Sequence, residues 1–268
     1  MNLKPYFITG TGRCGTMLLS RLFSLGENSH CDHESHFRHQ SLLHYYRGNG
    51  EMTSFREDIE HSLIPTLKEH GRNGKNYGVS SGHLYFAIPE LVQRFGTSAK
   101  FILLIRKPEA FVQSALARGF FNPSHPHACM QLYPHPRDEI YPHWATTTPF
   151  ERCLWYWELV NSFVLNEFQK LPDSQVHIVR IEDLNAEKAM DLCNFIGATD
   201  ILEDRVKELL SYRINATPDA GDKIEVNPYS HQLSKIKSIP DLSCQHKLLH
   251  QYTASLFDEI YGEKKSNG

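Results

Sequence analysis

Apolar positions along the chain fall into two patterns: short runs with β-branched or aromatic residues, and longer stretches with helical spacing. The short runs predict strands at 6–9, 30–33, 77–80, 100–105 and 175–181. Helical spacing follows four of them, at 17–25, 86–95, 109–118 and 186–196. This alternation predicts a three-layer α/β fold, with a parallel sheet flanked by helices on both faces and ligands bound beyond the carboxyl ends of the strands.

Other segments depart from this alternation. Residues 36–72 read as a helical insertion, and residues 150–171 predict one long, aromatic-rich helix. Residues 119–149 hold six prolines and four histidines without periodicity, which indicates a long, lid-like surface loop. The segment 213–240 is also irregular, and a last helix is expected from about residue 242 to 261.

The first predicted strand runs directly into a glycine-rich turn, GTGRCGT at positions 10–16, and then into a helix. Glycines at 10, 12 and 15 let the backbone turn tightly and approach an anion. The first N–H groups of the helix, at the positive end of its dipole, point at that anion. We therefore expect a phosphate-binding loop formed by Gly12, Arg13, Cys14, Gly15 and Thr16.

The loop matches only part of the Walker motif of ATP-binding proteins. The spacing from Gly10 to Gly15 fits, but Thr16 stands where the motif has lysine and Met17 where it has the Mg²⁺-binding hydroxyl. Without these groups the loop is poorly suited to ATP phosphoryl transfer. Arg13 supplies the charge instead, because its planar guanidinium can grip a tetrahedral oxyanion with two hydrogen bonds.

A second basic motif follows the predicted strand at 100–105. Arg106 stands at the strand end, Pro108 suits a first helical turn, and Ser114 lies one to two turns inside the helix. A guanidinium and a hydroxyl at this spacing suit a second phosphate, separate from the first. Two oxyanion sites on neighbouring strand ends indicate a nucleotide with phosphate at both ends of its ribose.

These motifs together resemble the sulfotransferases that use 3′-phosphoadenosine-5′-phosphosulfate (PAPS), which have a P-loop NTPase-like fold. The Arg13–Thr16 loop, the Arg106–Ser114 motif and the segment VRIEDL at 179–184 occur in the order that the family shows. The resemblance implies that the first motif binds the 5′-phosphosulfate of PAPS and the second its 3′-phosphate, with 3′,5′-adenosine bisphosphate (PAP) as product and no metal. Arg213 loosely resembles the late basic residues that close over the 3′-phosphate.

The sequence departs from the family pattern at several positions. Cys14 replaces a serine, Met17 a frequent threonine, and Leu18 the tryptophan that stacks on adenine in cytosolic members. Ile181 likewise replaces the tyrosine of the third motif. The residues that contact adenine therefore stay unassigned.

Sulfuryl transfer to a hydroxyl or amine acceptor needs charge stabilisation at the departing phosphate and a base for the acceptor. Arg13 would stabilise the charge. Glu34 stands 21 residues after Arg13, similar to the second glutamate of the C-x-E-E segment in protein-tyrosine sulfotransferases. His83 stands 23 residues before Arg106, similar to the histidine of the K-T-H-L segment in cytosolic small-molecule enzymes. The undisturbed spacing favours Glu34, but both stay open as the base.

Composition limits the partners. With 268 residues, 40% of them hydrophobic and a net charge of −3, the chain reads as a single domain, 1–268, without a nucleic-acid partner or membrane insertion. The first strand begins so early that we expect no signal peptide and a cytoplasmic protein. Six scattered cysteines predict free thiols, and the histidines of 119–149 are expected to line the acceptor pocket rather than bind a metal.

The acceptor stays open among small molecules, glycans, lipid headgroups and peptide tyrosines, and so does the oligomeric state. Two other functions also remain. An ATP-dependent small-molecule kinase would use the same loop for ATP, although the missing lysine speaks against it. A non-catalytic nucleotide-binding protein would bind the nucleotide without transferring any group.

Overall fold

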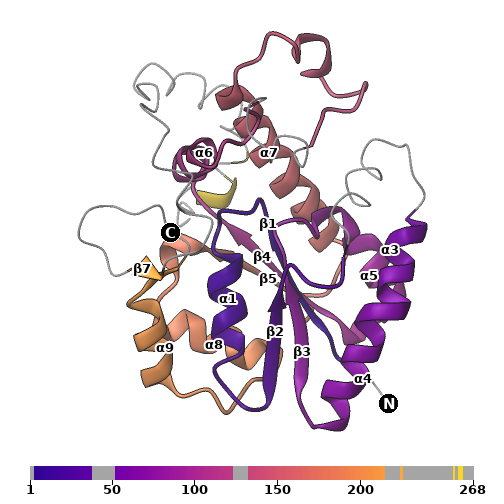
Figure 1. Ribbon diagram of the computed structural model, residues 1–268, viewed down its shortest axis with the longest axis vertical. Helices are drawn as coiled ribbons and strands as arrows, with labels where there is room; N and C mark the ends of the chain where they lie inside the picture. The colour runs from indigo at the N-terminus through magenta and orange to yellow at the C-terminus, as the bar shows by residue number, and fades with distance from the viewer. Residues whose placement is uncertain are drawn as a thin grey trace, which may run out of the picture.

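The computed structural model describes residues 3–37, 52–122, 132–214, 224–225, 256 and 259–261. Within these residues, five parallel strands form the central sheet in the order β2-β3-β1-β4-β5 (Figure 1). Their bounds are β1 Tyr6–Gly10, β2 Ser29–His33, β3 Asn76–Ser80, β4 Lys100–Ile105 and β5 Val176–Arg180. All five strands and their parallel arrangement confirm the predicted fold class.

Helices cover both faces of this sheet. Their bounds are α1 Thr16–Phe23, α3 Thr53–Asp58, α4 Ile64–Arg72, α5 Ile88–Phe95, α6 Pro108–Ala117, α7 Pro149–Phe168, α8 Ala186–Ile196 and α9 Glu203–Leu210. A π-helical turn, Ile59–Leu63, joins α3 to α4, and 3₁₀ turns lie at Tyr85–Ala87, Gly96–Ser98, Tyr141–His143 and Ile181–Asp183. Short strands β6 Arg213–Ile214 and β7 Ile224–Glu225 pair with each other.

Alternate residues of the strands pack into opposite faces, because side chains of a strand point to either side of the sheet in turn. On β4, Phe101, Leu103 and Ile105 join the core beneath α3 to α7. Ile102 and Leu104 join the core beneath α1, α8 and α9. The order helices, sheet, helices gives the three layers that the sequence predicts (Figure 1).

Local signals account for the ends of the helices. Thr148 and Glu151 form a capping box that starts α7, and Asn185 caps α8 by accepting a hydrogen bond from the Lys188 amide. Gly197, with φ 81°, ends α8 in the left-handed conformation that glycine adopts easily. Among the described residues, no helix combines the length and the apolarity that crossing a bilayer requires.

Some expectations fall partly outside the described residues. Residues 53–72 are helical, interrupted by the π turn, whereas 38–51 are not described. Of 119–149, residues 132–148 form turns and one 3₁₀ segment, and 123–131 are not described, so its role as a lid stays a prediction. Of the expected last helix, residues 256 and 259–261 are described and helical.

Candidate active site

The loop after β1 has the shape of an anion cradle. Gly12, Arg13 and Gly15 all have left-handed backbones, with φ of 70°, 53° and 104°. A Cβ on Gly10 would stand 2.4 Å from the Leu104 carbonyl oxygen, so only glycine fits there. The helix α1 starts at Thr16, and no described side chain caps its first N–H groups. These amides and the turn before them are the backbone groups with which proteins bind phosphate.

The two basic motifs meet at this cradle, although they are about a hundred residues apart in sequence. Arg13 Nε donates a hydrogen bond to Ser114 Oγ at 3.0 Å. Arg106 Nη1 donates to the carbonyl oxygen of Arg13 at 2.9 Å. The sequence predicts two separate anion sites, whereas here the Arg13 side chain reaches into the second one. The candidate sites therefore adjoin and share a guanidinium.

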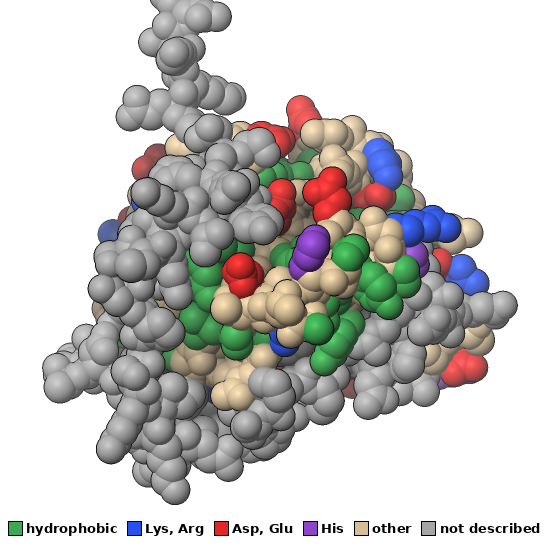
Figure 2. All heavy atoms as spheres, turned by 90° about the horizontal axis from the view of Figure 1, so that it is seen from above, with side chains coloured by type: hydrophobic (Ala, Val, Ile, Leu, Met, Phe, Trp, Pro, Cys, Tyr) green, Lys and Arg blue, Asp and Glu red, His purple; other side chains and the backbone are tan. Residues whose placement is uncertain are grey.

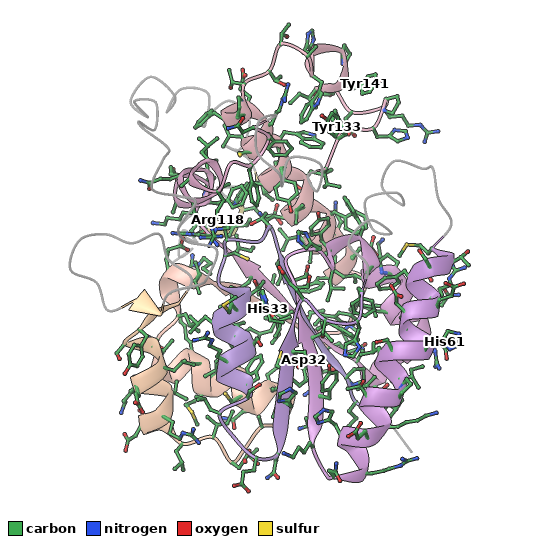
Figure 3. The ribbon with its side chains drawn as sticks, viewed as in Figure 1. Asp32, His33, His61, Arg118, Tyr133 and Tyr141 are labelled. Atoms are coloured by element: carbon green, nitrogen blue, oxygen red, sulfur yellow. The ribbon has the colours of Figure 1, made fainter. Side chains whose placement is uncertain are left out.

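Arg118 adds a third guanidinium that sequence reasoning missed. It follows Ser114 by four positions, and Figure 3 shows it above the first turn of α1. Burial, and then the charges of Arg118 and Arg106, lower the pKa of Arg13 to about 10. Three partly buried cations in one place create a strong positive potential, which favours a ligand with more than one negative charge.

The two candidate bases lie beside each other. Glu34 follows β2 and His83 follows β3, and these strands are neighbours in the sheet. His83 Nε2 is 4.0 Å from Glu34 Oε1, with side chains 27% and 51% exposed, so both remain accessible to a substrate. Figure 2 shows the surface that is uppermost in Figure 1. Acidic, histidine and hydrophobic side chains lie together in its described part.

The loop that carries His83 lies directly on the cradle. A Cβ on Gly82 would stand 2.7 Å from the Cα of Gly12, so the two backbones touch. Ser80 Oγ donates to the carbonyl oxygen of Thr16 at 2.8 Å and ties the end of β3 to the start of α1. The segment that carries His83 therefore lies against the cradle.

His33 is a further residue at this site that the sequence analysis did not single out. Its Nε2 lies 3.2 Å from Thr16 Oγ1, and Figure 3 shows it on β2 above Asp32. Burial lowers the pKa of His33 despite the opposing charge of Glu34. The sequence did hold a signal for His33. Side chains alternate between the two faces of a sheet, so His33 lies on the same face as Cys31, which packs beneath α1.

Two comparisons of the chain with known proteins are negative, because no family model and no curated protein matches it. Solved structures do match. A sulfotransferase from Alicyclobacillus acidocaldarius aligns with TM-score 0.50 and 15% identity over 95% of this chain and 94% of its own. The chain has the sulfotransferase fold. Sulfotransferase STF9 from Mycobacterium avium aligns with TM-score 0.50 and 11% identity, over 97% of this chain and 77% of its own.

Within this sulfotransferase fold, groups from α7 and from the turn after β5 brace the basic motif. Trp157 Nε1 donates to the Arg106 carbonyl oxygen at 2.8 Å, and its ring is fully buried, as expected for a core residue. Glu182 accepts a hydrogen bond of 2.7 Å from the amide of Lys107, just before α6. Glu182 thus supports the start of the helix that carries Ser114.

Other predicted residues have different outcomes. Cys14 is buried, and burial raises the pKa of its thiol to about 11, so it is a packed thiol rather than a reactive one. Arg213 lies in β6, but its side chain is outside the described residues. Residues 123–131 of the histidine-rich loop are also outside the described residues. Among the side chains that the structure describes, no group of three could hold a metal ion.

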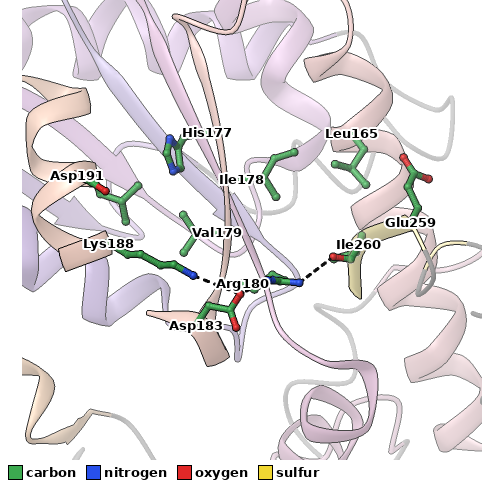
Figure 4. A pocket seen from close by; sticks show the side chains of 11 residues that line it. Leu165, His177, Ile178, Val179, Arg180, Asp183, Lys188, Asp191, Glu259 and Ile260 are labelled. Atoms are coloured by element: carbon green, nitrogen blue, oxygen red, sulfur yellow. Dashed lines mark hydrogen bonds and ion pairs between the residues drawn. The ribbon is translucent and has the colours of Figure 1, made fainter. Parts of the chain in front are cut away.

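A cavity of about 460 Å³ lies along the edge strand β5 (Figure 4). Three of its charged groups pair with one another, because Asp183 contacts both Arg180 and, at 3.5 Å, Lys188. These paired charges do not mark it as a second anion site.

Proposed function

We propose that the protein is a sulfotransferase that moves a sulfuryl group from PAPS to a hydroxyl or amine acceptor. The observation that carries the proposal is the contact of Arg13 with both Ser114 and Arg106 in front of α1. A nucleotide with phosphates at both ends of its ribose needs two adjoining anion sites, and the proposal is supported by these contacts between the two basic motifs.

The described residues fit such a donor. The Thr16 hydroxyl, the first amides of α1 and Arg13 would hold the 5′-phosphosulfate. Arg106, Ser114 and Arg118 would hold the 3′-phosphate, and the family resemblance adds Arg213. PAPS, when bound, supplies the sulfuryl group and leaves as PAP.

Arg13 and the first amides of α1 would stabilise the negative charge that grows on the 5′-phosphate during transfer, because they are fixed in place beforehand. Glu34 Oε1 or His83 Nε2 would take the proton of the acceptor. These two atoms lie 4.0 Å apart, so an acceptor hydroxyl or amine could approach either of them.

Ligand-dependent thermal shifts test the donor assignment. PAP, AMP and Mg²⁺-ATP are compared at the same concentrations; at about 100 times its Kd, PAP should stabilise the protein by about 2.7 kcal/mol. AMP lacks the 3′-phosphate and should stabilise less. Ser114→Ala should weaken the effect of PAP while leaving that of AMP unchanged. Stronger stabilisation by Mg²⁺-ATP than by PAP would instead favour the kinase.

Transfer assays test the bases. Sulfur-35-labelled PAPS is incubated with phenol, sugar and tyrosine-peptide acceptors and the wild type, Glu34→Gln or His83→Ala. Loss of the base should slow transfer by roughly 100-fold or more, while PAP affinity stays near that of the wild type. Full activity of both variants would remove both residues from this role.

A further inference from the structure

A chain of hydrogen bonds lies next to the candidate base, beneath the helices of residues 53–72. Tyr77 on β3 donates its hydroxyl proton to Asp32 Oδ2 at 2.5 Å. His36 Nε2 lies 2.5 Å from the same hydroxyl, and His36 Nδ1 lies 2.7 Å from Ser62 Oγ in the π turn. None of these four residues belongs to the site described above.

The direction of this chain follows from counting protons. Tyr77 has a single proton, which goes to Asp32, so its oxygen accepts from His36 Nε2–H. His36 Nδ1 then accepts from the Ser62 hydroxyl. A neutral imidazole satisfies both bonds, and burial lowers the pKa of His36, which favours this neutral form. Every donor in the chain points towards the Asp32 carboxylate.

Asp32 is suited to be the end of the chain. Its other oxygen, Oδ1, lies 2.9 Å from His30 Nε2. Burial alone would raise the pKa of Asp32, but hydrogen bonds from Tyr77 and His30 outweigh it and lower the pKa. Asp32 therefore stays ionised at neutral pH, and an ionised acceptor makes the stronger hydrogen bonds.

This series of hydrogen bonds stabilises a strained turn of the backbone. Glu34 and His36 are not glycines, yet both have left-handed backbones, with φ of 55° and 68°. Each such residue costs about 1–3 kcal/mol and persists only where its surroundings enforce it. The Glu34 amide donates to the Ser80 carbonyl oxygen at 2.9 Å, and the Phe37 ring stacks on Phe55 with centroids 4.7 Å apart. The clamped His36 side chain is the third constraint.

We infer that Asp32 is a positioning residue: through Tyr77 and His36 it holds the left-handed turn that presents the Glu34 carboxylate to His83 and the acceptor. The inference rests on the proposed function for its chemical consequence. It also explains why a tyrosine and a histidine are buried beside an edge strand. The strained turn fixes the position of the Glu34 carboxylate, and the hydrogen bonds keep the turn in that conformation.

Hydrogen exchange tests the structural half without any activity. Tyr77→Phe removes the hydroxyl but keeps the ring, which stacks on His70 with centroids 4.6 Å apart. Loss of a hydrogen bond to a charged group should speed exchange of the amides at 34–37 by roughly tenfold. Amides of α1 should be unaffected. Asp32→Asn should act in the same way, and unchanged exchange at 34–37 in Tyr77→Phe would overturn the inference.

Asp200→Asn is the matched control. Asp200 Oδ2 accepts hydrogen bonds from the amides of Glu27 and Asn28 at the opposite end of β2. The variant makes the same chemical change in a purely structural carboxylate, so it should speed exchange near 27–28 and leave 34–37 as in the wild type. Faster exchange at 34–37 in this variant as well would mean that β2 loosens as a whole, which also overturns the inference.

The labelled-PAPS assay tests the chemical half. In Tyr77→Phe, kcat should fall by roughly tenfold while the KM for PAPS and the PAP affinity stay unchanged, since the chain does not touch the donor cradle. Faster exchange with unchanged kcat would refute positioning. If PAP does not bind even the wild type, the proposed function fails, whereas the exchange result still shows whether Asp32 holds the turn.

Discussion

Replacing Arg13 by methionine should make the ligand-free protein more stable, although it removes the central cation of the proposed donor site. Methionine keeps an unbranched side chain of similar reach and removes the charge. The wild-type guanidinium is mostly buried and close to Arg106 and Arg118, and burial followed by these two charges lowers its pKa. A group with a lowered pKa in the folded state resists being charged there, so its charge opposes folding at neutral pH.

The magnitude follows from the same shift. A fall of the Arg13 pKa from 12.5 to about 10 corresponds to about 3 kcal/mol as an upper limit. Partial solvent contact reduces this figure, and losing the charge-assisted hydrogen bond to Ser114 removes about 1.5 kcal/mol. Arg13→Met should therefore raise the free energy of unfolding by about 1 kcal/mol without ligand. Its PAP affinity should fall by roughly 100-fold, as expected when a charge-assisted contact of about 3 kcal/mol is lost.

Urea unfolding with and without PAP measures both effects. Arg94→Met serves as control, because Arg94 pairs with Glu60 on the surface, their side chains being 44% and 48% exposed. Such a pair contributes less than about 1 kcal/mol, so this variant should be as stable as the wild type or slightly less, with unchanged PAP affinity. A clear loss of ligand-free stability in Arg13→Met would refute the reasoning, since it would mean that the guanidinium is held favourably without an anion.

Three further predictions follow from the site and its surroundings. Cys14, with a thiol pKa of about 11 and 1% exposure, should escape iodoacetamide at pH 8 in the native protein, and peptide mass spectrometry that finds it alkylated would contradict this. Gly82→Ala should destabilise the protein by about 1–3 kcal/mol in urea unfolding and weaken PAP binding, because its Cβ meets the Gly12 backbone; wild-type behaviour would mean that the loop does not press on the cradle. Burial lowers the pKa values of His33 and His36, so the unfolded chain binds protons that the folded chain resists. Stability should thus be complete above the unfolded value of about 6.5 and fall as the pH drops from 7 to 5, and unfolding curves that are unchanged across this range would speak against it.

The strands β1 and β4 were predictable because each is a short apolar run, and β4 is buried over almost its whole length. The helix α9 was not predicted, because Val206 is its single fully buried residue and its other apolar residues, Leu209 and Leu210, come together only at its end. A helix with one buried position leaves little periodic signal in the sequence.

The candidate site was predictable only as separate pieces. Glu34 and His83 read as rival bases from two subfamilies, but the strand order puts β2 beside β3 and brings both to one place. From the sequence, Arg118 was interpreted only as the last residue of a helix. The neighbouring residues do not indicate that the end of α6 lies near Arg13. Strand order and helix packing are set by long-range contacts, which a single sequence does not display.

The hydrogen bond from Trp157 to the Arg106 carbonyl has a practical consequence for mutagenesis. The indole is fully buried, yet its hydrogen bond helps to fix where Arg106, the residue proposed to bind the 3′-phosphate, leaves its strand. A library of substitutions along α7, screened only for nucleotide affinity, would thus return hits at a position that never meets the nucleotide. Such hits would identify residues that position Arg106 and not residues that contact the nucleotide.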